Sequence, residues 1–466
     1  MPLRNIHISA TGKLFFALMV ATAVGALGVS ISLSSKQEAA PTPGRGAKPP
    51  AVTWHEKTEV ASGGGYKGPW RMNESEYDYV DDPTVAIDAK GFVGVAWADQ
   101  SRKDIFFQIY GPDGKRRFKE SVNVSRSPKI FSWLPRIVIS GRDATEMYIL
   151  WQEIVFSGGS HGGEIFFARS TDSGKTFRRP VNLSNSIAGD GKGRLNSRYW
   201  HNGSLDLAVG SQGNLYVAWT EYEGALWFRR STDGGDSVSE PMVIAGGGGA
   251  KPARGPALAI GVEGAIYLAW TVGEDPAADI HFARSDDDGR SFGKPRIVFK
   301  SGGHSDAPKI AVSRDGTVHV VYGESPVGPF GQYHIRYTRS SDGGMTFEQP
   351  REISGPKTEF ESRHFPALSV DDADNLYVLW ERFPGRGIRP IGLGFVYSND
   401  GGRTFASTSV VPGSADPELG FNGNQQGLLM RKLAVNGTGA IAVVNSTFKR
   451  GETSHVWLFR GQATGR

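Results

Sequence analysis

Short runs of aliphatic and aromatic residues alternate with turn residues along most of the chain. In residues 255–299 these runs follow one another as ALAI, IYLAW, IHFAR and RIVF, with glycines, prolines and charged residues between them. Runs of this kind, rich in β-branched and aromatic residues, are typical of strands. The first run of the unit recurs as PTVAI, PRIVI, LDLAV, PALAI, PKIAV, PALSV and RKLAV. The pattern predicts an all-β chain made of repeated four-stranded units.

A motif at the end of the third run fixes the register of these units. HFARSDDDGRSF at 281–292 has relatives at 167–177, 228–238, 337–347 and 395–405, and they share Ser-x-Asp-x-Gly-x-Thr/Ser. The patterned aspartates are Asp172, Asp233, Asp287, Asp342 and Asp400. Weaker copies at 107–118 and 459–466 flank the set. Four strands per unit predict a β-propeller, with seven blades favoured and six as the alternative.

The last unit has three predicted strands, at 432–436, 440–446 and 455–460. A circular array of sheets would leave an unpaired edge there unless another segment completed the blade. The segment 52–62 is therefore expected to supply the missing strand and to close the ring.

The motif resembles the Asp-box, or BNR repeat, of sialidase-like propellers, and the resemblance covers residues 80–466. It implies that each box is a turn between the third and fourth strands, on the face away from that family's active site. The aspartate can accept hydrogen bonds from turn amides, and the glycine supplies a positive φ. We expect a structural role for the five aspartates, with calcium binding by the DDDG of residues 286–289 as the alternative.

The N-terminal segment predicts a membrane attachment. Residues 14–33 carry no charge, and Arg4 and Lys13 precede them. About 20 such residues span roughly 30 Å of hydrocarbon in a helix. We expect residues 1–13 in the cytoplasm, a transmembrane anchor at 14–33 with a cleaved signal peptide as the alternative, and a Pro/Gly/Ala-rich tether at 34–51. The propeller at 52–466 would then lie on the periplasmic or cell-surface side, or be secreted.

Composition removes several classes of site. The chain has no cysteine, which excludes disulfides, thiolate metal sites and a cysteine nucleophile. No metal motif with recognisable spacing occurs, and no cofactor is predicted. The 52 Lys and Arg residues are scattered among 48 Asp and Glu residues, so a nucleic-acid partner is not expected.

Candidate chemistry lies in the loops that precede strand one and those that join strands two and three. Strand two ends near an acid in five units, at Asp99, Glu153, Glu221, Glu324 and Glu381. The start of strand one carries Arg136, Arg198, Arg254, Lys309, Arg363 and Arg431, with His201, His304 and His364 near it. These groups could pair as salt bridges between neighbouring units. Alternatively, a ring of arginines could bind a carboxylate ligand.

The resemblance implies a sialidase site, in which three arginines hold the sugar carboxylate beside an acid/base aspartate and a tyrosine–glutamate pair. The sequence departs from that pattern, because the first unit reads DDPTVAI and the loop from Asp99 to Asp104 is short. We therefore predict a membrane-tethered propeller that binds a glycan or protein ligand at the central rim, or serves as an envelope scaffold. The binding residues would be Arg136, Arg198, Arg254, Arg363, His201, His364, Glu221 and Glu381. The alternative is a glycoside hydrolase of extracytoplasmic glycans that uses Asp99, Glu153 or Glu324 as catalytic acids.

Overall fold

The computed structural model describes residues 52–140, 145–155, 163–186, 188–356, 361–384, 390–415 and 429–464. These residues form β-strands and no α-helix. None of them belongs to a helix long and apolar enough to cross a membrane. The predicted anchor at 14–33 and the tether at 34–51 lie outside the described residues.

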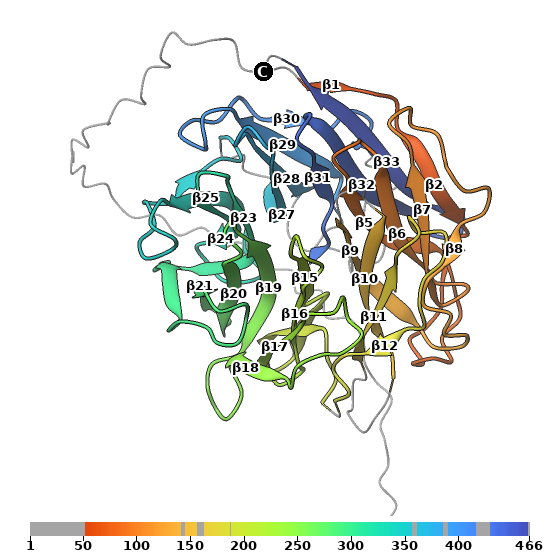
Figure 1. Cartoon of the computed structure of the whole chain (residues 1–466), viewed down its shortest axis with the longest axis horizontal. Helices are drawn as coiled ribbons and strands as arrows, with labels where there is room; N and C mark the ends of the chain where they lie inside the picture. Colours follow the sequence, from red (N-terminus) through yellow and green to blue (C-terminus); the bar gives the residue numbers. More distant parts are fainter. Residues whose placement is uncertain are drawn as a thin grey trace, which may run out of the picture. The chain divides into compact units, whose positions relative to one another are not determined.

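The strands form sheets set around a common axis, so the predicted all-β propeller is confirmed (Figure 1). Within each unit the chain runs outward, and each strand pairs with the next in antiparallel fashion. Among the described residues, four sheets have four strands each. They consist of β5 (Val80–Ile87), β6 (Val93–Asp99), β7 (Asp104–Tyr110) and β8 (Val122–Asn123); β9 (Ser132–Ser140), β10 (Glu146–Glu153), β11 (Glu164–Ser170) and β12 (Val181–Asn182); β15 (Leu205–Val209), β16 (Leu215–Thr220), β17 (Leu226–Ser231) and β18 (Met242–Ala245); and β27 (Ser362–Val370), β28 (Leu376–Phe383), β29 (Gly392–Ser398) and β30 (Ser409–Val410).

Two further units are joined into one eight-stranded sheet. It holds β19 (Ala253–Ile260), β20 (Ile266–Glu274), β21 (Ala277–Ser285) and β22 (Arg296–Phe299), followed by β23 (His304–Val312), β24 (Val318–Ser325), β25 (His334–Ser340) and β26 (Arg351–Glu352). The link is a single parallel pair, Ala278 with His304. The described residues therefore do not show the expected seven separate four-stranded blades, or six: besides this merged sheet there are the four separate sheets above and the one that the N-terminal strands complete.

The expected closure by the N-terminal segment is confirmed. β31 (Leu433–Val435), β32 (Ala440–Lys449) and β33 (Thr453–Ala463) form a sheet that β1 (Val52–Trp54) and β2 (Thr58–Gly63) complete by pairing antiparallel with β33. Val60 of β2 is buried in the core beside this sheet. Two short hairpins, β3 (Tyr66–Lys67) with β4 (Tyr77–Asp78) and β13 (Lys192–Asn196) with β14 (Tyr199–Asn202), stand outside the larger sheets.

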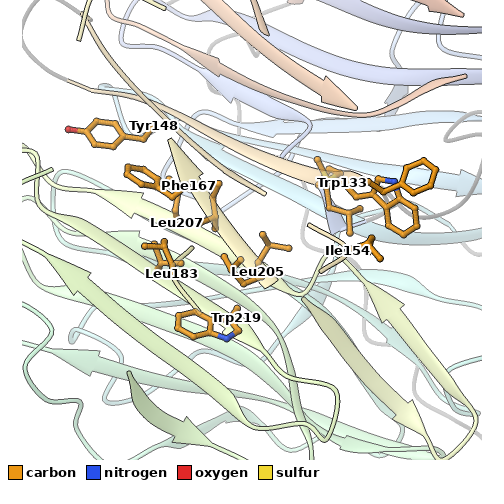
Figure 2. Packing of buried hydrophobic residues seen from close by; sticks show 14 of the residues in the cluster. Trp133, Tyr148, Ile154, Phe167, Leu183, Leu205, Leu207 and Trp219 are labelled. Carbon is orange, nitrogen blue, oxygen red and sulfur yellow. The ribbon is translucent and has the colours of Figure 1, made fainter. Parts of the chain in front are cut away.

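Side chains from neighbouring sheets fill the space between them. Between the β9–β12 and β15–β18 sheets, Leu205, Leu207 and Trp219 gather near Leu183, each at most 2% exposed (Figure 2). Fully burying one such side chain contributes about 1.5–3 kcal/mol. The large apolar residues that alternate along the strands thus hold neighbouring sheets together by hydrophobic packing.

A β-bulge recurs near the start of the innermost strands β5, β9, β19, β23 and β27. At each bulge, one residue with positive φ stands directly before a proline; these residues are Asp82, Leu134, Gly255, Ala307 and Phe365. Proline has no N–H to contribute to the ladder, so it fits a position where pairing is interrupted. The bulge gives the residue just before it the same position in each sheet, and those residues are Asp81, Trp133, Arg254, Asp306 and His364.

The five box aspartates each tie a turn between the third and fourth strands. Each carboxylate accepts hydrogen bonds from the serine hydroxyl two residues earlier and from the backbone N–H and hydroxyl four residues later, as in Ser170, Asp172 and Thr176. In DDDG, Asp286 pairs with Arg284. Asp288 is not merely solvated, because it accepts hydrogen bonds from Tyr216 and Arg230 of the preceding sheet. The chain's own groups therefore occupy all three carboxylates.

Deleting residues 52–63 should lower the melting temperature by many degrees. The deletion removes both closing strands and exposes the outer edge of β33 together with the core around Val60. Thermal denaturation followed by circular dichroism measures the effect. Thr53→Ala, at an exposed position of β1, serves as the control and should melt like the wild type. An unchanged melting temperature after the deletion would contradict the closure.

Replacing Asp287 by alanine should lower the melting temperature by a few degrees, whereas Asp286→Ala should leave it nearly unchanged. Asp287 satisfies three donors of its turn, and Asp286 makes only a surface ion pair. A chelator should not move the melting temperature of the wild type. A large fall on chelation, restored by Ca²⁺, would instead support calcium binding.

Candidate functional site

The chain's own backbone crosses the end of the central channel where strand one begins. Leu429 offers its carbonyl to Arg136 and Lys309, and the Arg431 carbonyl accepts from the Val85 N–H. Arg431 also binds Asp206 through two hydrogen bonds, at 2.8 and 2.9 Å. Residues 429–431 thus join β5, β9, β15 and β23 across the mouth. The remaining channel is a cavity of about 270 Å³, lined mostly by aliphatic residues of the innermost strands.

A second group of polar residues lies off the axis, on the same face. We call it the imidazole site and define it as His201, Arg254, His304, Asp306, Tyr333 and His364. Arg254, Asp306 and His364 are the residues that precede the bulges of β19, β23 and β27, and His304 begins β23. His201 comes from β14, and Tyr333 from the loop between β24 and β25. All six come from the loops and strand starts opposite the box turns.

A buried ion pair forms the floor of the site. Arg254 Nε lies 3.3 Å from Asp306 Oδ1, and the two side chains are only 1% and 3% exposed. Asp306 also accepts hydrogen bonds from the Thr271 hydroxyl and the Ala307 N–H. Arg254 donates to the carbonyls of Arg194 and Gly273. Removing one partner of such a pair leaves a buried charge and typically costs about 3–5 kcal/mol.

The protonation of His304 follows from its two neighbours. Its Nε2 lies 3.0 Å from a guanidinium nitrogen of Arg254, which can only donate, so Nε2 must accept. The single proton of the neutral ring therefore sits on Nδ1 and points at the Tyr333 hydroxyl, 2.9 Å away. Because the Tyr333 oxygen accepts this bond, its own proton is left to donate to another group.

His364 is held by stacking rather than by hydrogen bonds. Its ring lies 3.7 Å from that of Tyr333 at an angle of 9°, and 3.9 Å from that of Phe365. Both ring nitrogens are buried and have no hydrogen-bond partner among the described residues. Buried polar groups are nearly always paired in native proteins, so two unpaired nitrogens on one buried imidazole require an explanation, such as a catalytic role, an ordered water or a bound ligand.

His201 is the most exposed polar member of the site. Its side chain is 25% exposed, its Nδ1 lies 3.9 Å from Asp306 Oδ2, and its ring packs edge-on against Phe365 at 5.6 Å. Burial lowers the pKa of His201 below its usual value, and Arg254 adds to the effect against the opposing charge of Asp306. A neutral imidazole next to a carboxylate is a suitable general base.

Burial and neighbouring charges fix the protonation states of four other titratable groups of the imidazole site. Burial lowers the pKa of His304 to about 4 and that of His364 well below its usual range. Burial would raise the pKa of Asp306, but Arg254 and the histidines hold it well below normal. Burial raises the pKa of Tyr333 well above that of a free phenol. Near neutral pH the site therefore contains neutral imidazoles, a protonated tyrosine and one carboxylate paired with arginine.

The three predicted catalytic acids do not come together. Asp99 caps the turn after β6 through Ser101 and Arg102, and Glu324 binds Arg336 at 2.6 Å. Glu153 is buried beside Ser127 and Trp151, and burial raises its pKa. Each belongs to a different sheet, those of β6, β10 and β24, and each serves a local network there.

The predicted binding residues separate into two groups. Arg254, His201 and His364 join the imidazole site. Arg136 is 1% exposed and donates to backbone carbonyls of residues 134, 135, 203 and 429, while Arg363 donates to those of Ser354 and Gly355. Glu381 forms an ion pair with the buried Lys432. The backbone of Glu221 pairs with that of Asp190 in an isolated antiparallel β-bridge. The guanidinium groups of Arg136 and Arg363 thus bind carbonyls of the chain itself, and their place in a ring of ligand-binding arginines stays a prediction. Arg198 remains exposed at the tip of the β13–β14 hairpin.

Asp306 and Tyr333 were missed by the sequence analysis. Asp306 stands before the bulge in SDAPKIAV, the position of Arg254 in ARGPALAI and of His364 in RHFPALSV. Comparing the residue two places before the proline in consecutive units would have found all three. Tyr333 directly precedes strand three in GQYHIRY, where no repeated signal distinguishes it.

Fold and site together define a propeller whose polar centre lies beside the axis and is rich in imidazoles. No family model and no curated protein sequence matches the chain. Among solved structures, an ulvan lyase described as polysaccharide lyase family PL25 superposes with a TM-score of 0.56 at 12% identity, over 86% of this chain and 95% of that chain. A protein of unknown function from Dyadobacter fermentans superposes with a TM-score of 0.52 at 16% identity, over 74% of this chain and 99% of that chain.

A Hadza microbial sialidase matches more loosely, with a TM-score of 0.44 at 14% identity, over 79% of this chain and 73% of that chain. The solved structures similar to this chain thus include carbohydrate-active propellers. At these identities the likeness establishes the propeller fold, which agrees with the resemblance drawn from the repeats.

Acidification should destabilise the protein before its carboxylates titrate. The pKa of His304 falls on folding from its ordinary 6.5 to about 4, so the unfolded chain binds more protons within that window. The stabilisation is complete above about pH 6.5 and is lost as the pH falls toward 4, by up to about 3 kcal/mol. Urea unfolding at pH 7 and pH 5 measures this loss. His201 and His364 contribute in the same direction, so His304→Gln should reduce the dependence without abolishing it, and His455→Gln should leave it unchanged. An equal slope in wild type and His304→Gln would refute the assignment.

Proposed function

We propose that this protein degrades a uronate-containing glycan by β-elimination at the imidazole site. The observation that carries the proposal is the pairing of two neutral proton carriers, His201 near Asp306 and Tyr333 beside His304. The PL25 lyase that shares the fold was solved with a repeat of glucuronic acid and 3-sulfated rhamnose. That ligand motivates the choice of a uronate as the substrate.

The chemistry assigns one step to each group. The His201 imidazole removes the proton α to the uronate carboxylate, and the bond from the neighbouring ring carbon to the glycosidic oxygen breaks as a carbon–carbon double bond forms. The Tyr333 phenol gives its proton to the departing oxygen, so that no charge accumulates on it. The unpaired N–H of His364 would bind the uronate carboxylate, whose negative charge otherwise opposes removal of the proton.

A hydrolase is the weaker candidate because of the carboxylates. Most glycoside hydrolases use a pair of carboxylic acids on either side of the bond that breaks. Asp306 is the one carboxylate of the imidazole site as the structure describes it, and it is buried and bound to Arg254. Asp99, Glu153 and Glu324 lie in other networks. Glycan binding without cleavage is the second candidate, and the unpaired nitrogens of His364 favour a bound ligand in either case.

The proposal extends to the location and organisation of the chain. We infer that residues 14–33 attach the propeller to a membrane and that it meets its glycan outside the cytoplasm; the charge-free run behind Lys13 supports this.

We also infer that the propeller has seven blades. The eight-stranded sheet repeats one four-stranded unit twice and is joined by a single pair of residues, which supports counting it as two blades.

The proposed function is tested with a panel of uronate polysaccharides: ulvan, alginate, pectate, hyaluronan and chondroitin sulfate. The wild type should generate the ultraviolet absorbance of an unsaturated uronate from at least one polymer. His201→Gln and Tyr333→Phe should lower kcat at least about 100-fold, because each removes one proton-transfer group. His455→Gln is the matched control, since His455 has similar exposure, 22%, and its own carboxylate partner, Glu59. Reducing ends that form without the absorbance would indicate hydrolysis and overturn the proposal, as would a fully active His201→Gln variant.

A further inference from the structure

Two exposed aromatic side chains meet next to the imidazole site. Tyr199 and Phe330 are 55% and 53% exposed, and their rings lie 5.4 Å apart, edge to face. Tyr199 belongs to the tip of the β13–β14 hairpin, and Phe330 to the loop between β24 and β25. Large aromatic residues are usually kept from water, so a paired and exposed couple of this size calls for an explanation.

The chain ties both rings to the proposed chemistry. Tyr199 and His201 are alternate residues of one strand, and therefore share one face of the hairpin about 7 Å apart. Gly193, the strand partner of His201, packs on that face against Arg254, where an added Cβ would approach the Arg254 Cβ to 2.8 Å. Phe330 precedes Tyr333 by three residues in the same loop. The aromatic pair thus continues the surface on which His201 and Tyr333 stand.

An exposed cation directly precedes Tyr199 in the chain. Arg198 precedes Tyr199, is exposed, and has no carboxylate partner for its guanidinium group among the described ion pairs. By contrast, Arg194 on the other face of the hairpin is bound to Glu274 at 2.6 Å and lies 3.5 Å from Glu223. Arginine suits planar, two-pronged recognition of carboxylate and sulfate-like anions.

We propose that Tyr199, Phe330 and Arg198 form a subsite for an acidic sugar ring next to the bond that is cleaved. The two aromatic rings offer apolar faces to a pyranose, and the guanidinium group binds its carboxylate or sulfate. The enzyme would then hold an internal stretch of an anionic polysaccharide rather than a chain end. This subsite rests on the proposed function, because it is adjacent to the same imidazole site.

The test compares a long and a short substrate. The probe is the panel polymer that the wild type cleaves fastest, together with an oligosaccharide of that polymer too short to fill both positions. Tyr199→Ala and Phe330→Ala should each raise KM for the polymer about tenfold and leave kcat and the KM of the short substrate unchanged. Arg198→Ala should raise KM for the polymer and weaken its dependence on salt, whereas Arg198→Lys should retain part of both.

Tyr66→Ala is the matched control, because Tyr66 is 52% exposed and lies on the separate β3–β4 hairpin. Melting temperatures identify any variant that fails to fold. An unchanged KM for the polymer in both aromatic variants would overturn the subsite and leave the proposed function standing. A wild type that neither binds nor cleaves any panel polymer would overturn both, and equal losses on short and long substrates would place these residues in the cleavage site instead.

Discussion

Closing the ring is the constraint on which the rest of this molecule depends. β33 would present an unpaired edge if β1 and β2 did not pair with it, and the last sheet would then have no fixed position against the first. Closure places every innermost strand between the innermost strands of the preceding and the following unit. Equivalent positions of consecutive units then lie next to each other, and a repeated sequence becomes a repeated set of contacts.

The imidazole site is a direct product of that arrangement. The bulges before Pro256, Pro308 and Pro366 give Arg254, Asp306 and His364 the same position in three consecutive units, so one ion pair and one stacked imidazole form side by side. The hairpin β13–β14 contributes His201 to the site, and the loop after β24 contributes Tyr333.

The axis of this propeller is used differently from its flank. Arg136, Lys309 and Arg431 hold the backbone of residues 429–431 over the channel, so cations that could have bound a ligand stabilise the chain. Charged side chains that satisfy buried carbonyls are costly to remove, because the carbonyls would lose their hydrogen-bond partners. The imidazole site lies away from these residues, in the sector formed by β19, β23 and β27.

The sequence by itself determined the strands, their grouping in fours, the turn role of Asp172 and its equivalents, and the segment that closes the ring. These features depend on local patterns: alternating apolar residues, glycines with positive φ, and side chains that bond within their own turn. Only the tertiary structure decided that Arg136 binds carbonyls while Arg254 binds Asp306, and that Glu153 and Glu324 never meet. Arg136 follows Pro135 directly and Arg254 stands two residues before Pro256, but the partners that each binds lie far away in the chain, Leu429 in one case and His304 in the other. Which polar side chains share a site depends on contacts between units, and a pattern within one unit cannot contain them.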